Sequence, residues 1–456
     1  MNLATYLERN AARKPDKIAL IFKDQRYTFR DYNEQANRVA HGLRKLGIRL
    51  GDRVAIMLPN CPEFLFTHYG LLKLGAITVG VNVLLKSEET RYILDNSQSS
   101  AILVHHTLLP VVQAVWDRLP DLRHVIVLGG QGTDGTISYE DLVKEPAPDM
   151  VAVDAAPDER IMIFYTSGTT GVPKGAVHTH ESIGNFMDAI SQRFGVTEQD
   201  VMCSTLPLFL LSILILGPVA AMHNGIPCYL MERYNAVDFV RSLKEWRISL
   251  ILATVPTMFY EITRLPDEIA KDVDFSSLRY ASCGGSPMPP DMRREFEAKY
   301  NFRIVHAYGG TESPATVSTD PPDRERKFDS VGTVLPHIKV KIVDDSDNEV
   351  PTGTVGEICT GPQTEGPYAG MYKTLKEYWR MPEATAEALK GGFFHWGDLG
   401  YLDEDGFLYI VDRKKDMIIR GGNNVYPKEL ELVLYEDPRV LECAVVGVPH
   451  DRLGEV

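Results

Sequence analysis

The strongest chemical signal in the sequence is a loop, rich in glycine and hydroxyl residues, that ends on a lysine. It follows the apolar run 161–164 and contains Thr166, Ser167, Gly168, Thr169, Thr170, Gly171 and Lys174. Glycines bring backbone N–H groups close to an anion, hydroxyls add donors, and the lysine adds a positive charge. No Gly-Lys-Ser/Thr closes the loop, so it is not a Walker A motif. By composition alone the segment could be an ordinary flexible loop. Its hydrogen-bond donors predict that it binds phosphate.

A second cluster combines an aromatic ring, glycines, a hydroxyl and a carboxylate directly after a predicted strand at 303–305. It reads His306-Ala307-Tyr308-Gly309-Gly310-Thr311-Glu312. Such a set can stack on a base, approach a phosphate and hold Mg²⁺ through the glutamate. Upstream, Cys283-Gly284-Gly285-Ser286 is a similar passage from a strand into a turn. Taken alone, each of these segments is interpreted as a plain turn.

The third cluster is acidic and aromatic, and it reads Trp396-Gly397-Asp398 followed by Asp412-Arg413. Asp398 could accept hydrogen bonds from the two hydroxyls of a ribose, with Arg413 as a partner donor. As isolated residues, the same two side chains would form a structural salt bridge.

Two other patterns look like ligand sites, but their surroundings argue against it. The segment 130–135 has the GxGxxG spacing of a dinucleotide-binding turn, yet no helix begins inside it. His178 and His180 are spaced like a metal pair, and no third ligand lies at a supporting spacing. We therefore interpret 130–135 as a loop and 178–180 as a strand that ends at a helix cap. An NAD-dependent oxidoreductase is disfavoured.

Composition excludes several classes of function. The 456 residues are 44% apolar and 24% charged, which is typical of a folded protein with a large core. With 48 Lys and Arg against 62 Asp and Glu, the net charge is -14, and no basic run points to nucleic acid. The six cysteines form no CxxC pair, and the N-terminus lacks the apolar stretch of a signal peptide. These features predict a cytoplasmic protein.

Residues 201–231 contain no Asp, Glu, Lys or Arg, and a run of this length raises the question of a membrane span. Prolines, glycines and polar residues interrupt it. We therefore predict a buried helix and strand that line a pocket, and no transmembrane segment.

The elements that must position the three clusters alternate between short apolar strands and helices. The pattern predicts helices at 29–46, 63–74 and 88–95, and strands at 17–22, 53–58, 77–81, 101–104, 124–128, 161–164, 250–253 and 303–305. Short apolar strands between helices indicate parallel sheets covered on both faces. Beyond about residue 330, strands at 339–343, 356–360 and 408–411 alternate with turns, and a helix at 428–436 and a strand at 440–448 follow.

Together the three clusters, in this order and at these separations, closely resemble the adenylate-forming superfamily of acyl-CoA synthetases, luciferases and peptide-synthetase adenylation domains. The resemblance covers essentially the whole chain, and the segment 420–431 looks most like fatty acyl-CoA ligases. It implies an α/β fold with a large N-terminal domain, residues 1–412, built of several subdomains with layered sheets and a small β-barrel-like subdomain. Residues 413–456 would form a hinge and the start of a small, mobile α+β C-terminal domain.

The resemblance also implies a two-step reaction that uses ATP, Mg²⁺ and coenzyme A. A small carboxylic acid attacks the α-phosphate of ATP to give acyl-AMP and pyrophosphate, and a thiol then displaces AMP. The loop 166–175 would grip the departing phosphates, with Thr166 and Glu312 near Mg²⁺. The implied nucleotide contacts are Gly284, Gly285 and Tyr308 around the adenine, Thr311 at the α-phosphate, Asp398 and Arg413 at the ribose, and the neighbouring Ser286 and Gly309. Lys415 matches the hinge, and Gly421 and Gly422 would flank the pantetheine channel.

Two departures from the family pattern bear on the substrate and on the first step. Relatives carry a histidine after Pro-Leu-Phe, where this chain has Leu210 after Phe209. The apolar run 210–216 predicts an acyl pocket suited to a medium- or long-chain fatty acid. Relatives also continue to a C-terminal lysine that bridges the acyl carboxylate and the α-phosphate. This sequence stops before that lysine, so we expect slow adenylation from the chain as it stands.

Two alternatives stay open at this point. One is an acyl-AMP ligase that loads a carrier protein instead of coenzyme A. The other is a non-catalytic protein that binds a nucleotide or an acyl group. Assembly into a homodimer is left open as well.

Overall fold

The computed structural model describes residues 2–130, 132, 135–147, 149, 151–166, 172–286, 288–322, 324–420, 423–435, 440, 443–450 and 454–456. It has the α/β architecture that the sequence predicts. Its helices are α1 (Ala4–Arg13), α2 (Phe29–Lys45), α3 (Pro62–Leu74), α4 (Ser87–Ser97), α5 (Leu109–Gln113), α6 (Tyr139–Val143), α7 (His180–Arg193), α8 (Leu211–Leu214), α9 (Ala220–Asn224), α10 (Ala236–Trp246), α11 (Pro256–Thr263), α12 (Asp267–Ala270), α13 (Pro290–Tyr300), α14 (Pro382–Ala388) and α15 (Pro427–Leu434).

The first large sheet has eight strands, of which two join antiparallel at one edge. In spatial order they are β19 (Glu377–Tyr378), β9 (Lys174–Thr179), β8 (Arg160–Thr166), β4 (Ile77–Gly80), β3 (Arg53–Met57), β5 (Ala101–His105), β6 (His124–Leu128) and β7 (Thr136–Ser138). The strands from β8 to β7 are parallel, while β9 and then β19 join antiparallel at the edge. The edge strand β19 follows β9 by about 200 residues in the sequence, so only tertiary folding brings it there.

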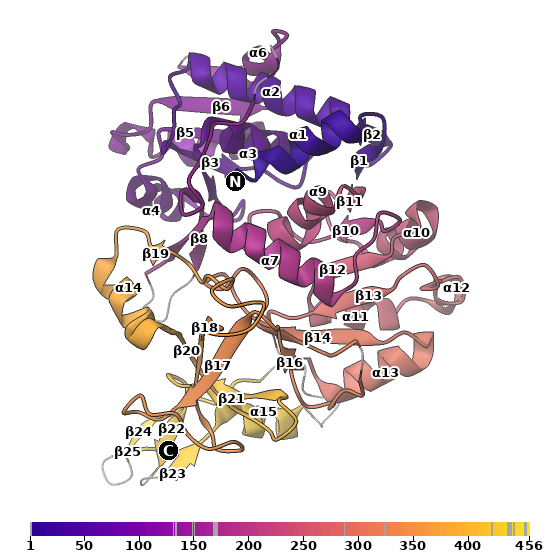
Figure 1. Ribbon diagram of the computed structural model, residues 1–456, viewed down its shortest axis with the longest axis vertical. Coiled ribbons are helices and arrows are strands. Elements are labelled where there is room, and N and C mark those ends of the chain that lie inside the picture. The colour runs from indigo at the N-terminus through magenta and orange to yellow at the C-terminus, as the bar shows by residue number, and fades with distance from the viewer. Residues whose placement is uncertain are drawn as a thin grey trace.

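The second large sheet has nine strands and is parallel through its centre. In spatial order they are β16 (Thr333–Val334), β15 (Ser318–Thr319), β14 (Ile304–Tyr308), β13 (Tyr280–Cys283), β12 (Leu250–Thr254), β10 (Met202–Ser204), β11 (Cys228–Leu230), β1 (Ile18–Phe22) and β2 (Gln25–Thr28). In Figure 1 the helix α7 crosses the middle of the molecule, between the first sheet above and the strands β12–β14 below. Ligands of such parallel sheets bind outside the carboxyl ends of the strands.

Two small sheets complete the structure. One is antiparallel, with the order β17 (Ile338–Val343), β18 (Gly356–Pro362), β20 (Phe394–Leu402) and β21 (Leu408–Arg413). The other contains β23 (Asn423–Val425), β22 (Ile418–Arg420), β25 (Gly454–Glu455) and β24 (Pro449–His450). In Figure 1 both lie below the eight-stranded sheet, with the C-terminal one at the lower end of the molecule. The proposed boundary at 412/413 falls at the end of β21, and the division into two domains stays a prediction.

Local sequence signals explain where the helices begin. The hydroxyl of Thr28 accepts from the N–H of Asp31 at 3.1 Å, and the Asp31 carboxylate accepts from the N–H of Thr28 at 2.9 Å. This reciprocal capping box starts α2, which spans nearly the predicted helix 29–46. Thr179 caps α7 in the same way with Ser182, which confirms the interpretation of 178–180 as a strand that ends at a helix cap.

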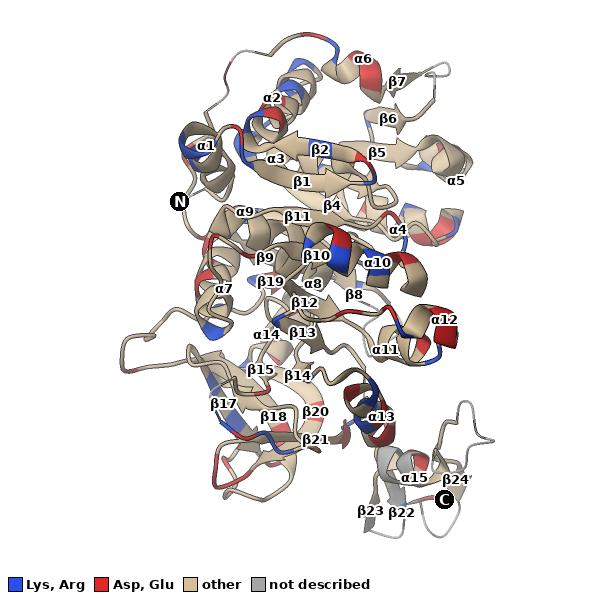
Figure 2. Cartoon of the chain, turned by 90° about the vertical axis from the view of Figure 1, so that its right-hand side faces the viewer, with Lys and Arg blue, Asp and Glu red and all other residues tan. Residues whose placement is uncertain are grey.

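The charge-free run 201–231 folds into the interior of the protein, as the sequence predicts. It forms β10, α8, a π-helical turn (Ile215–Val219), α9 and β11, and most of its side chains are buried. Within the described residues, no helix has both the length and the apolar character needed to cross a membrane. Figure 2 shows basic and acidic residues interspersed along helices such as α10 and α13.

One predicted strand is wrong. The sequence predicts a strand at 440–448, but the structure assigns none to residue 440 or to 443–448, the described part of that segment. The backbone N–H of Val445 donates to the Glu431 carboxylate at 2.9 Å, and that of Cys443 to the Tyr435 hydroxyl at 3.4 Å. Side chains of α15 and of the residue after it take these two donors, and a backbone pairing appears only at the end of the described segment, where Val448 exchanges hydrogen bonds with Val456 beside β24 and β25.

Beneath the site strand β14 lies a buried ion pair whose loss we expect to be costly. Arg293 is 1% exposed and donates to the carboxylate of Asp320, which also accepts from the N–H of His306 at 3.0 Å. Replacing Arg293 with methionine would leave the Asp320 charge buried without its cation. We expect a loss of about 3–5 kcal/mol in the free energy of unfolding, measured by urea titration.

Arg294→Met is the matched control, because Arg294 lies on the same helix and pairs with Asp291 at an exposed position. We expect it to change the unfolding free energy by less than about 1 kcal/mol. Equal losses in the two variants would contradict the assignment of a stabilising role to the buried pair.

Candidate active site

The predicted phosphate loop connects two paired strands, β8 and β9. Thr166 is the last residue of β8, Lys174 is the first of β9, and the two are register partners across the hairpin. Ser167, Gly168, Thr169, Thr170 and Gly171 lie outside the described residues. The structure thus places the hydroxyl and the ammonium that bound the loop at one end of the eight-stranded sheet.

The carboxylate of Glu312 meets the base of this loop. Its Oε1 atom accepts from the Thr166 hydroxyl at 3.2 Å and from the Tyr378 hydroxyl at 3.1 Å. Its backbone carbonyl accepts from the N–H of Leu375 at 2.6 Å. The ammonium of Lys174 lies over the Tyr378 ring, 5.2 Å from its centroid. Burial, with the Glu312 charge beside it, raises the pKa of Tyr378, so its hydroxyl stays protonated and donates.

Thr311, the neighbour of Glu312, is held from β9. The Nε2 atom of His178 lies 2.7 Å from the Thr311 carbonyl oxygen. A carbonyl can only accept, so Nε2 carries the proton and Nδ1 faces the Ser182 hydroxyl at 3.5 Å. Burial lowers the pKa of His178 to about 4, so the ring is neutral near pH 7. The 311–312 turn is therefore tied to β8, β9 and β19.

Asp398 and Arg413 are brought together as register partners on β20 and β21. The Nε atom of Arg413 lies 2.8 Å from Asp398 Oδ1, and the Tyr308 hydroxyl donates to Asp398 Oδ2 at 2.6 Å. Burial and the Asp398 charge raise the pKa of Tyr308, which keeps this donor protonated. A carboxylate already held by two donors is fixed in direction, as recognition of a diol requires.

The indole of Trp396 connects the second and third clusters. Its centroid lies 5.3 Å from that of the Tyr308 ring, and its Nε1–H donates to the Thr360 hydroxyl at 3.0 Å. A Cβ on Gly310 would come within 2.9 Å of this indole, and one on Gly309 within 2.1 Å of the Ala315 carbonyl oxygen. Both positions therefore require glycine for close packing.

The segment 284–286 lies beside the second cluster because β13 and β14 are parallel neighbours. A Cβ on Gly284 would lie 2.8 Å from the Ala307 carbonyl oxygen, and Gly285 has φ +80°, which favours glycine. Ser286 is exposed in the same turn. The structure thus brings these three predicted positions to the strand end that carries Tyr308.

Two other predicted residues, Lys415 and Leu210, have no hydrogen bond or ion pair to the clusters among the described residues. Lys415 is exposed in the turn after β21, whereas its neighbour Lys414 is held by Glu357 at 3.1 Å. Leu210 is 45% exposed at the start of α8, and most of the run 211–216 is buried in the main core. Gly421 and Gly422 lie outside the described residues.

The described residues fit a magnesium–nucleotide complex by their chemistry. Mg²⁺ is usually held by one or two carboxylates together with substrate phosphates and water. Glu312 supplies one carboxylate, and its Oε2 atom has no protein donor among the described residues. No group of three or more His, Cys, Asp or Glu suited to a metal occurs in the described part of the chain. A metal here would depend on the nucleotide for its remaining ligands.

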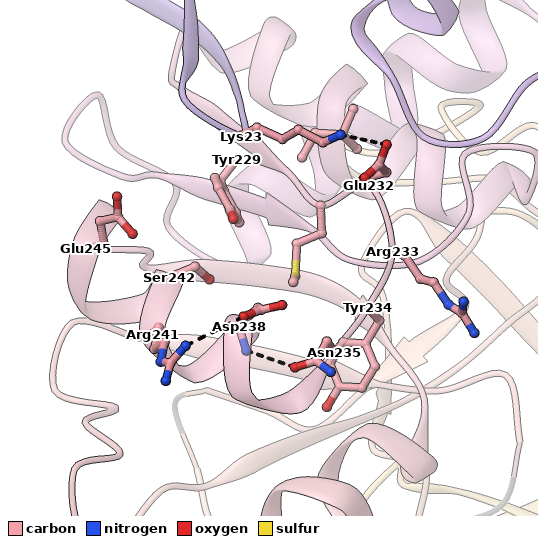
Figure 3. Close-up of a pocket in the computed structure, with 12 residues that line it drawn as sticks. Lys23, Tyr229, Glu232, Arg233, Tyr234, Asn235, Asp238, Arg241, Ser242 and Glu245 are labelled. Carbon is pink, nitrogen blue, oxygen red and sulfur yellow. Dashed lines mark hydrogen bonds and ion pairs between the residues drawn. The ribbon is translucent and has the colours of Figure 1, made fainter. Parts of the chain in front are cut away.

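A hollow of about 650 Å³ lies elsewhere and contains none of the predicted site residues. Figure 3 shows two ion pairs among its side chains, with Lys23 2.8 Å from Glu232 and Arg241 4.0 Å from Asp238. Its walls are formed by Lys23, Tyr229, Leu230, Met231, Glu232, Arg233, Tyr234, Asn235, Asp238, Arg241, Ser242 and Glu245. We assign it no function.

Two residues at the site were not predicted from the sequence. His178 could have been suspected, because a histidine among the apolar residues of a strand needs a hydrogen-bond partner once it is buried. Tyr378 carries no such signal, since its partner Glu312 and its neighbour Lys174 come from distant parts of the chain.

Comparison with known proteins identifies the family. The model of the AMP-binding enzyme family matches residues 7–368. The chain belongs to the AMP-binding enzymes. It is 35% identical to the long-chain-fatty-acid–CoA ligase FadD13 of Mycobacterium tuberculosis, over 100% of this chain and 87% of the relative. It is 33% identical to the crotonobetaine/carnitine–CoA ligase of Salmonella agona, over 95% of this chain and 84% of the relative.

Solved structures of a CoA ligase and of a fatty acyl CoA synthetase show the same fold. The anthranilate CoA ligase AuaEII, in complex with anthranoyl-AMP, superposes with a TM-score of 0.90 at 28% identity, over 98% of this chain and 85% of that one. A Mycobacterium tuberculosis fatty acyl CoA synthetase gives 0.83 at 32% identity, over 100% and 87%. The resemblance to the adenylate-forming superfamily and to fatty acyl-CoA ligases is therefore confirmed.

Proposed function

We propose that this AMP-binding enzyme is an AMP-forming fatty acid:CoA ligase that joins a medium- or long-chain fatty acid to coenzyme A through acyl-AMP. The observation that carries the proposal is the convergence of three sequence clusters. Thr166, paired with Lys174 across the base of the loop, contacts Glu312 of the second cluster. Tyr308 of the same cluster contacts Asp398, which pairs with Arg413. Relatives named as long-chain-fatty-acid–CoA ligases support the choice of substrate.

In the first half-reaction, negative charge moves onto the departing pyrophosphate. Lys174 and the hydroxyl and N–H donors of the loop would stabilise that charge. Thr166 and Glu312 would hold Mg²⁺, which when bound neutralises phosphate charge and orients the leaving group. Asp398 would accept from the ribose hydroxyls, and the turn at 284–286 with Tyr308 would border the adenine.

The residues assigned to the acyl group and to its thiol acceptor are supported by fewer contacts. Leu210, exposed at the start of α8, would contact the acyl chain, and the absence of a charge there favours an aliphatic acid. Lys415 would serve as the hinge and Gly421 with Gly422 as the wall of the pantetheine channel. All six cysteines are free, which supports a reducing cytoplasmic setting.

The defining experiment measures pyrophosphate release from ATP and Mg²⁺ with fatty acids of C6 to C18, with and without CoA. Release that depends on chain length, followed by CoA-dependent AMP, would establish the ligase. Carnitine-type and aromatic acids belong in the same panel, because relatives acting on such acids are also similar. Preference for either class over every fatty acid would overturn the proposed substrate. Transfer to a phosphopantetheinylated carrier but not to CoA would favour the acyl-AMP ligase.

Replacing Lys174 with alanine should slow acyl-AMP formation about tenfold without unfolding the chain. A charge-assisted hydrogen bond from the ammonium to phosphate contributes about 1.5–3 kcal/mol, so the loss of one such bond slows the step by about tenfold or more. The measurement is pyrophosphate release at saturating fatty acid, with Lys271→Ala, at an exposed position beyond α12, as the control. Unchanged turnover in Lys174→Ala would remove this residue from the phosphate site.

A further inference from the structure

Tyr378 lies between the carboxylate of Glu312 and the ammonium of Lys174 in the proposed phosphate site. Its hydroxyl donates to Glu312 Oε1 at 3.1 Å, and its ring face lies under the ammonium of Lys174, 5.2 Å from the centroid. The side chain is buried, with the residue 7% exposed. One side chain thus contacts both the carboxylate proposed to hold the metal and the cation proposed to hold the phosphates.

The backbone around Tyr378 is anchored on both sides. Tyr378 is the register partner of Ala176 in β9, and Trp379 donates its N–H to the Gly175 carbonyl at 2.7 Å. The N–H of Tyr378 donates to the Thr385 hydroxyl of α14 at 3.0 Å. At the other end of β19, Glu377 accepts from Arg160 at 2.6 Å. An anchored ring can fix its neighbours in place, whereas a ring on a free loop could not.

We propose that Tyr378 is a positioning residue that aligns the magnesium-binding carboxylate and the phosphate-binding lysine of the site. This inference rests on the proposed function and goes beyond it, because Tyr378 need not touch the nucleotide. Its hydroxyl, together with that of Thr166, occupies Oε1 of Glu312 and leaves Oε2 as the oxygen that would bind the metal. Its ring holds the Lys174 ammonium by a cation–π contact at the loop end.

Two substitutions separate the two contacts. Tyr378→Phe removes the hydroxyl and keeps the ring beneath Lys174, whereas Tyr378→Leu removes both. Tyr300→Phe is the matched control, because that hydroxyl donates to the Ile262 carbonyl at 2.7 Å in a region that holds no proposed site residue. Thermal melting of all three variants measures how far each substitution lowers the melting temperature, separately from its effect on ATP binding.

The test measures ATP binding by calorimetry in the presence of Mg²⁺ and again in EDTA. We expect Tyr378→Phe to weaken binding about tenfold with Mg²⁺ and less than about twofold in EDTA, since its effect acts through Glu312. Tyr378→Leu should weaken binding under both conditions, because Lys174 also loses its support. Tyr300→Phe should leave both affinities unchanged.

Three results would overturn the inference. One is a Tyr378→Phe variant with the Mg²⁺-dependent ATP affinity of the unmodified chain. Another is an equal loss with Mg²⁺ and in EDTA, which would mean that the hydroxyl only supports the fold. The third is an unmodified chain whose ATP binding is independent of Mg²⁺. A chain that binds ATP with Mg²⁺ and obeys the variant pattern but forms no acyl-CoA would refute the proposed function and leave this inference standing.

Discussion

Replacing Glu312 with glutamine should lower the rate of acyl-AMP formation by about 10²–10³-fold, the usual cost of removing one preplaced electrostatic group from a reacting centre. Glutamine has the shape of glutamate and keeps an oxygen that can accept from Thr166 and Tyr378. The fold should therefore be preserved while the negative charge that attracts Mg²⁺ is lost. The measurement is single-turnover pyrophosphate release across a range of Mg²⁺ concentrations.

The matched control for Glu312 is Glu268→Gln, an exposed glutamate on α12. It should leave both the rate and the Mg²⁺ dependence unchanged. If Glu312→Gln instead kept the rate of the unmodified chain at every Mg²⁺ concentration, the metal would not be held by this residue.

The second large effect is expected from Asp398→Asn, which should raise the KM for ATP by about 10–100-fold with a smaller change in kcat. A charged acceptor contributes about 1.5–3 kcal/mol to a hydrogen bond, and the amide has one acceptor oxygen in place of two. The Tyr308 hydroxyl and Arg413 both donate to this carboxylate, so the change also weakens its alignment.

A modified nucleotide makes this prediction specific to the ribose. The unmodified chain should prefer ATP over 2′-deoxy-ATP, and Asp398→Asn should reduce that preference. Asp117→Asn, at an exposed position in the short 3₁₀ helix Trp116–Arg118, should preserve it. A variant that discriminates as strongly as the unmodified chain would show that Asp398 does not contact the sugar.

The sequence predicts most of the elements because their signals are local. Apolar runs of strand length, a capping box at Thr28 and a proline at the start of α3 depend on neighbouring residues alone. The same holds for the phosphate loop, whose glycines and hydroxyls are adjacent in the chain. The predicted strand at 440–448 fails for the converse reason. A strand requires a partner along its length, and there the side chains of Glu431 and Tyr435 take the N–H donors of Val445 and Cys443.

By itself, the sequence determined the α/β class, the order of the clusters and the residue types of the site. Only the tertiary structure decided which of these residues meet. Asp398 and Arg413 are 15 positions apart and become partners through the register of β20 and β21. Tyr378 reaches Glu312 and Lys174 because β19 adds to the edge of a sheet built some 200 residues earlier. Strand pairing over such separations depends on the packing of the whole chain, and no local pattern of side chains encodes it.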